Sequence, residues 1–110
     1  LTKGKVLIST DEIIKISKFF SIIAHTPGRL RVRVNPKIKE LGGDISLSDI
    51  ENLPNKIDGI IEIKINKIIA SITITYDFKI FKPNIWEDLV NQRNLDEISI
   101  LINNLAKEVI

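Results

Sequence analysis

Two stretches of alternating apolar and polar residues constrain the fold of this chain more than any other feature. Over residues 61–65 isoleucine alternates with glutamate and lysine, and over residues 71–76 isoleucine and tyrosine alternate with serine and threonine. A period of two places the apolar side chains on one face of a strand. The connection over residues 66–70 is short enough to join neighbouring antiparallel strands. The two stretches therefore predict a β-hairpin in which Ile61, among others, faces a core and the polar residues face solvent.

A third alternating stretch, HTPGRLRVRV, begins at the only histidine of the chain, His25. Its arginines are separated by leucine and valine, so a strand would carry the arginines on one face and the apolar residues on the other. The arginines are Arg29, Arg31 and Arg33. Proline fixes φ and glycine tolerates positive φ, so Pro27 and Gly28 predict a sharp bend immediately before this strand. Together with the hairpin, the stretch predicts a three-stranded core sheet.

Apolar residues at helical spacing predict short helices on both sides of this strand. One helix is expected over about residues 10–18, with Asp11 as its N-cap, and an extended segment leads from it into the bend. After the strand, a helical piece is bounded by an Asn-Pro pair and by two glycines, over residues 35–43. A further helix starts at Ser46 or at Ser48, where the sequence SDIE has the pattern of a capping box.

Two more helices follow the hairpin. The first opens at Pro83 and turns Trp86 inward, and the second is capped by Asp96. The resulting order, β-α-β-β-α, is that of the ferredoxin-like split βαβ fold without its final strand. This order predicts an α+β fold with an open-faced antiparallel sheet. The N-terminal segment either takes the vacant edge of that sheet or leaves the sheet to end there.

The whole chain, residues 1–110, is expected to form a single domain, because its length suffices for one core. Residues 1–18 would form an N-terminal arm, residues 20–80 the core and residues 83–110 the C-terminal helices. No run approaches the roughly 18 apolar residues of a membrane span, and no signal peptide is recognised. A cytoplasmic location is therefore expected.

The composition excludes several kinds of chemistry. The chain has no cysteine, which rules out disulfides, thiolate metal sites and cysteine nucleophiles. Its formal net charge of +2 is too small to indicate nucleic acid as the partner. The sequence shows no paired carboxylates, nucleophile–base pair or glycine-rich phosphate loop, so no enzymatic activity is expected.

The stretch HTPGRLRVRV, the helical region after it and the hairpin together resemble the heavy-metal-associated (HMA)-like domain family. The turn over residues 58–60 and the strand over residues 71–77 correspond to sequence patterns of that family, and the match spans about residues 20–80. The resemblance implies the same ferredoxin-like fold. Metallochaperone members bind copper or other soft cations through paired cysteines in the loop after the first strand. Here that loop, at residues 35–39, has no sulfur ligand, so copper binding is not expected.

The TPGR motif at residues 26–29 is similar to that of a cysteine-free branch of the family. Domains of this branch resemble the N-terminal regions of P-type metal-transporting ATPases and their small partner proteins, some of them linked to bacterial iron-storage compartments called ferrosomes. The branch also has an arginine several residues before the motif, where this chain has Ser17 and Lys18. The resemblance implies an accessory role in metal homeostasis, chiefly of iron. The implied partner is a P-type metal ATPase or a second copy, through which the protein would reach the cytoplasmic face of a membrane or storage compartment.

The sequence leaves several interpretations of this region open. An interaction surface would use Thr26, Pro27, Gly28, Arg29, Arg31 and Arg33. The arginines can instead form a solvated polar face that is partly neutralised by Glu62 on a neighbouring strand. His25 either hydrogen-bonds the turn or binds ferrous iron or haem as a direct ligand. Phosphate or nucleic acid can bind the arginines weakly, although the polar faces of the strands offer no aromatic residue for base stacking.

Overall fold

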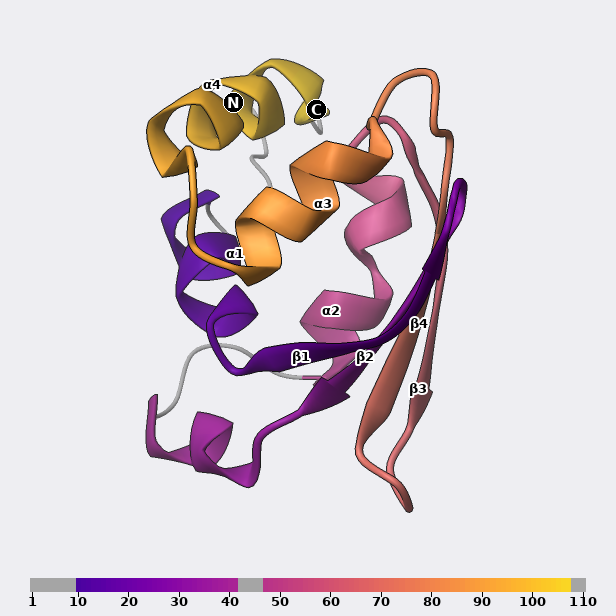
Figure 1. Ribbon diagram of the computed structural model, residues 1–110, viewed down its shortest axis with the longest axis vertical. Coiled ribbons are helices and arrows are strands. Elements are labelled where there is room, and N and C mark those ends of the chain that lie inside the picture. Colours follow the sequence, from indigo (N-terminus) through magenta and orange to yellow (C-terminus); the bar gives the residue numbers. More distant parts are fainter. Residues whose placement is uncertain (1–9, 42–46, 108–110) are drawn as a thin grey trace, which may run out of the picture.

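Four antiparallel strands form one open sheet in the order β1-β2-β4-β3. The computed structural model of the protein describes residues 10–41 and 47–107. The strands are β1 (Phe20–Thr26), β2 (Arg29–Val34), β3 (Ile60–Asn66) and β4 (Ser71–Tyr76). The helices are α1 (Thr10–Ser17), α2 (Leu47–Glu51), α3 (Pro83–Val90) and α4 (Leu95–Leu105), with 3₁₀ turns η1 (Pro36–Leu41) and η2 (Leu53–Asn55). The helices lie on one face of the sheet and leave the other face open (Figure 1).

This architecture confirms the predicted α+β fold with an open antiparallel sheet, and it is consistent with a ferredoxin-like arrangement. The three predicted strands are β2, β3 and β4, and β4 lies between the other two. β1 pairs with β2 and takes the edge for which the sequence left two alternatives open. The part of the predicted N-terminal arm at residues 1–9 lies outside the described residues.

The predicted helix caps are displaced along the chain. α1 and α4 each begin at the residue before the predicted cap, so Asp11 and Asp96 lie in the first turn of their helices. α2 begins at Leu47, so Ser48 lies within the helix, and the alternative start at Ser46 lies outside the described residues. A carboxylate in the first turn still stabilises a helix, because it faces the positive end of the helix dipole.

A β-bulge changes the face of one residue in the predicted hairpin. The pairing of β3 with β4 shifts between Ile60 and Glu62, so Ile61 has no partner in the ladder. Its side chain is 60% exposed, and the prediction that Ile61 faces the core is wrong. Ile60 and Ile63 are buried instead, because an extra residue in one strand reverses the alternation on its two sides.

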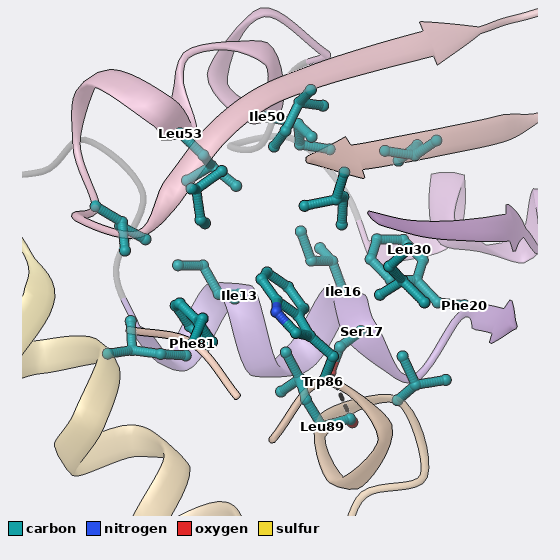
Figure 2. A pocket seen from close by; sticks show the side chains of 17 residues that line it. Ile13, Ile16, Ser17, Phe20, Leu30, Ile50, Leu53, Phe81, Trp86 and Leu89 are labelled. Carbon is teal, nitrogen blue, oxygen red and sulfur yellow. Dashed lines mark hydrogen bonds between the residues drawn. The ribbon is translucent and has the colours of Figure 1, made fainter. Parts of the chain in front are cut away.

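The core lies between the inner face of the sheet and the helices. Leu30 and Val32 of β2 are fully buried there, and Phe81 stacks on Trp86 with ring centroids 4.5 Å apart. Within the described residues, a cavity of about 40 Å³ lies beside the indole ring of Trp86 and is lined by apolar side chains and Ser17 (Figure 2). Pockets for small molecules usually enclose roughly 300–1,000 Å³. The core cavity is therefore too small to be a candidate ligand site.

Candidate interaction surface

The TPGR motif forms the tight turn between β1 and β2. Thr26 pairs with Arg29, so Pro27 and Gly28 are the central residues of the turn. Gly28 has a φ of +91°, which residues with a side chain rarely adopt, and proline before such a glycine is typical of a type II turn. The backbone N–H of Tyr76 donates to the carbonyl oxygen of Gly28 at 2.9 Å, which connects the turn to β4. The predicted bend is confirmed.

Arg29, Arg31 and Arg33 lie along β2 on the open face of the sheet, and we call these residues the arginine stripe. On β4 the stripe faces a row of hydroxyl residues in the pairs Arg29–Thr75, Arg31–Thr73 and Arg33–Ser71. Arg29 and Arg33 are exposed, and Arg31 is half-buried. The predicted separation of arginines from apolar residues is confirmed, because Leu30 and Val32 between them are buried.

Glu62 does not neutralise the arginine stripe. Glu62 lies on β3 and pairs with Thr75 of β4, so the whole of β4 separates it from β2. Two strand spacings amount to roughly 10 Å. Among the described residues, no carboxylate forms an ion pair with any of the three guanidinium groups. The prediction that Glu62 lies on a strand next to the stripe is wrong, because the neighbour of β2 on this side is β4 and not β3.

A shallow hollow of about 210 Å³ opens between β1 and β2 at one end of the stripe. Thr26, Arg29 and Arg31 line it, together with Ala24 and His25. The guanidinium groups offer planar pairs of N–H donors, and the threonine hydroxyl adds a further donor. Such a set of donors suits the oxygens of a carboxylate or a phosphate.

The charge of this part of the chain is one-sided. From Ile13 to Lys39 the sequence contains no acidic residue, and β1 and β2 both fall within that range. The charged side chains of β1 and β2, the two strands at this side of the sheet, are therefore all cationic. A clustered positive field of this kind attracts anionic partners even when the net charge is small.

His25 lies on the opposite, inner face of the sheet. A second β-bulge, at Ile23, shifts the pairing of β1 so that His25 lies opposite the buried Leu30. The side chain of His25 is 5% exposed. Its Nε2 atom is 2.7 Å from the hydroxyl of Tyr76, and its Nδ1 atom is 2.8 Å from Oε2 of Glu87. We call this set of contacts the histidine bridge.

The histidine bridge connects β1 to β4 and to α3. A neutral ring with its proton on Nδ1 satisfies both contacts, because the N–H donates to the carboxylate and Nε2 accepts from the hydroxyl. The prediction that His25 bonds the turn is wrong, since its partners belong to other elements. Iron or haem at either ring nitrogen would have to displace Tyr76 or Glu87. Within residues 10–41 and 47–107 there is also no group of three or more histidine, cysteine or acidic residues that could hold a metal ion.

The hydroxyl of Tyr76 remains protonated in this setting. Burial raises the pKa of Tyr76 above its usual value, the backbone of Gly28 opposes that shift, and the negative charge of Glu87 adds to it. A phenol with a raised pKa is a hydrogen-bond donor at neutral pH and not a base. The bridge is therefore suited to holding the β1–β2 hairpin against α3 rather than to proton transfer with solvent.

Sequence reasoning missed Glu87 and the role of Tyr76. The alternation of residues 71–76 predicts that Tyr76 points inward, and this pattern alone was enough to predict that Tyr76 is buried. No signal places His25 beside Glu87, because the bulge at Ile23 follows from tertiary pairing and Glu87 lies far along the chain.

No helix in the described part of the chain is long and apolar enough to cross a membrane. Comparison of the chain with protein-family models, with curated proteins and with solved structures finds no match.

Proposed function

We propose that the protein is a non-catalytic interaction module that binds an acidic protein surface through the arginine stripe. The observation that carries this proposal is the absence of an ion-pair partner for three exposed or half-exposed guanidinium groups, judged over the described residues. Like charges that neighbour each other on a sheet repel, and an anionic partner relieves that repulsion. Carboxylates suit the stripe because a guanidinium can bind them with two parallel hydrogen bonds.

The resemblance to cysteine-free HMA-like domains supports a more specific form of the proposal. The protein would be an accessory module in metal homeostasis, chiefly of iron, and its partner would be a cytoplasmic region of a P-type metal ATPase or a second copy of the same chain. Two observations agree with this form. The TPGR motif sits at the turn that leads into the stripe, and from β2 onward the chain runs strand, helix, two strands, helix, with β1 as an additional strand before it.

The first test measures binding of the full chain to an oligo-glutamate peptide by fluorescence anisotropy at low and at physiological salt. We expect binding that weakens with salt, because exposed charges are screened. A variant with Arg29→Ala, Arg31→Ala and Arg33→Ala should bind about tenfold more weakly, since several charge pairs of modest strength are lost together. A variant with Lys15→Ala, Lys79→Ala and Lys82→Ala is the control, because it removes the same charge from exposed positions elsewhere.

Equal losses in the arginine and lysine variants would show that only net charge matters, and the stripe would not be the binding surface. Tighter binding to single-stranded nucleic acid than to the peptide would favour the alternative partner class instead. The specific form is tested by co-purification with the cytoplasmic region of a P-type metal ATPase. Retention of that ATPase by the arginine variant would contradict it.

A further inference from the structure

The loop between β3 and β4 presents apolar side chains to solvent at one end of the molecule. We call residues 67–70, with the sequence KIIA, the hairpin tip. Ile68 is 95% exposed and Ile69 is 43% exposed. Figure 1 shows this loop at the lower end of the long axis, beyond the helices that cover the sheet. The two isoleucines therefore contribute little to the core of their own chain.

Three hydrogen bonds support the backbone of the hairpin tip. The side-chain oxygen of Asn66 accepts hydrogen bonds from the backbone N–H groups of Ile68 and Ile69, at 3.0 and 3.3 Å. The carbonyl oxygen of Ala70 accepts a hydrogen bond from the N–H of Val34 at 2.8 Å, which ties the tip to β2. The apolar side chains are thus displayed on a fixed support, and little ordering is needed before they contact a partner.

Cationic residues lie in the tip and next to it on the open face of the sheet. Lys67 belongs to the tip itself, and Lys64 lies on the open face of β3. Arg33 pairs with Ser71, the first residue after the tip. From Ile63 to Thr75 the chain contains no acidic residue. The exposed apolar residues therefore have positively charged residues beside them and no carboxylate in the adjoining strand segments.

The shape of the tip favours a lipid surface over a protein as its occupant. A stable protein interface buries about 800 Å² on each partner, and two side chains on a projecting loop supply only a small part of that area. A bilayer can instead surround a projecting loop, so that apolar side chains enter the interfacial region while lysine and arginine meet anionic headgroups. Apolar residues with cations beside them match both layers of such a surface.

We propose that the hairpin tip binds anionic lipid bilayers, with Ile68 and Ile69 inserted and with Lys64, Lys67 and Arg33 against the headgroups. This contact would be direct, and it goes beyond the proposed binding of an acidic partner by the arginine stripe. The turn between β1 and β2 lies at the opposite end of the sheet (Figure 1), so it would point away from the membrane.

The test is sedimentation of the full chain with vesicles of phosphatidylcholine alone and with phosphatidylglycerol added. We expect binding to the anionic vesicles only, with a fall as salt is raised. A variant with Ile68→Ser and Ile69→Ser should bind at least about tenfold more weakly, because two isoleucine side chains lose their burial. Ile100→Ser is the matched control, since Ile100 is also exposed, at 62%, but lies on α4.

A second readout uses the absence of cysteine from the chain. The emission of a polarity-sensitive fluorophore attached to Ile68→Cys should shift to shorter wavelength on anionic vesicles, whereas the same label on Ile100→Cys should not.

The proposal is overturned if the unmodified chain does not sediment with anionic vesicles, if both serine variants bind equally, or if both labels respond alike. It is also overturned if Ile68→Ser changes the oligomeric state by analytical ultracentrifugation, because the tip would then contact a second copy. The tip variant retains the whole stripe, so failure here leaves the peptide-binding test unaffected.

Discussion

The two hairpins lie side by side in the sheet, but their turns point to opposite ends of it and are built in contrasting ways (Figure 1). The β1–β2 hairpin has a two-residue turn with glycine at its positive-φ position, and His25 connects it to α3. The β3–β4 hairpin has a longer loop with Ala70 at a φ of 52°. The side-chain oxygen of Asn66 accepts hydrogen bonds from N–H groups of this loop, and the N–H of Val34 in β2 donates to the carbonyl oxygen of Ala70. A buried side chain near the first turn attaches it to α3, whereas the isoleucine side chains of the second loop are exposed.

This contrast shows that a hairpin can be ordered in two ways. A side chain that turns inward makes its hydrogen bonds and packing contacts within the fold, as His25 does. A loop that is ordered by backbone and asparagine contacts leaves its side chains available, as Ile68 shows. Substitutions in the two hairpins should therefore affect stability to different degrees.

The largest difference is expected between His25→Ala and Ile68→Ala. Loss of the imidazole leaves the buried hydroxyl of Tyr76 without its partner and removes a contact to Glu87, so the free energy of unfolding should fall by about 2 kcal/mol. Ile68→Ala should change it by less than about 0.5 kcal/mol, because the side chain is exposed. Chemical denaturation measures both. Equal losses would show that the histidine bridge does not anchor its hairpin.

The next effect concerns the two positive-φ positions, which should respond in opposite directions. Gly28→Ala places a Cβ atom at a φ of +91° and should lower the free energy of unfolding by about 1.5 kcal/mol. Ala70→Gly removes such a Cβ atom from the other hairpin and should raise the free energy of unfolding by about 0.5 kcal/mol. The gain is small because glycine has greater freedom in the unfolded chain. Thermal and urea unfolding of both variants check the signs. A loss of stability in both variants would contradict the contrast.

A smaller loss of stability than for His25→Ala or Gly28→Ala is expected from Tyr76→Phe. Loss of one hydrogen bond to His25 should lower the free energy of unfolding by about 1 kcal/mol at neutral pH. The raised pKa of Tyr76 adds a dependence on pH, since the unfolded chain ionises its tyrosine near the ordinary value of 10.0 while the folded chain does not. The stability that the protonated hydroxyl of Tyr76 contributes is therefore fully present below the unfolded pKa of 10.0. It is lost as pH rises through the higher pKa of the folded chain.

The alkaline decline in stability should be shallower in Tyr76→Phe than in the unmodified chain. Tyr76 is the only tyrosine, so tyrosinate absorbance reports its ionisation directly. Ionisation at the ordinary pKa in the folded protein would contradict the buried position of the hydroxyl.

Much of the fold follows from the sequence, because alternation and turn chemistry are local properties. The residues of β2, β3 and β4, the bend at Pro27-Gly28 and the outward position of the arginines were all predictable in this way. The bulges at Ile23 and Ile61 were not, because an extra residue in a ladder is defined by the partner strand. The same limit applies to the site. The stripe could be read from β2 alone, but the histidine bridge depends on a register that only the folded sheet defines.

Ile23 is the one residue of β1 outside the pairing with β2. Phe20 and Ile22 on one side of it, and His25 on the other, already occupy the faces that an uninterrupted strand of one residue fewer would give them. The strand can therefore lose Ile23 while each remaining side chain keeps its face. A deletion at this point of β1 would leave the register of the arginine stripe and of the histidine bridge unchanged.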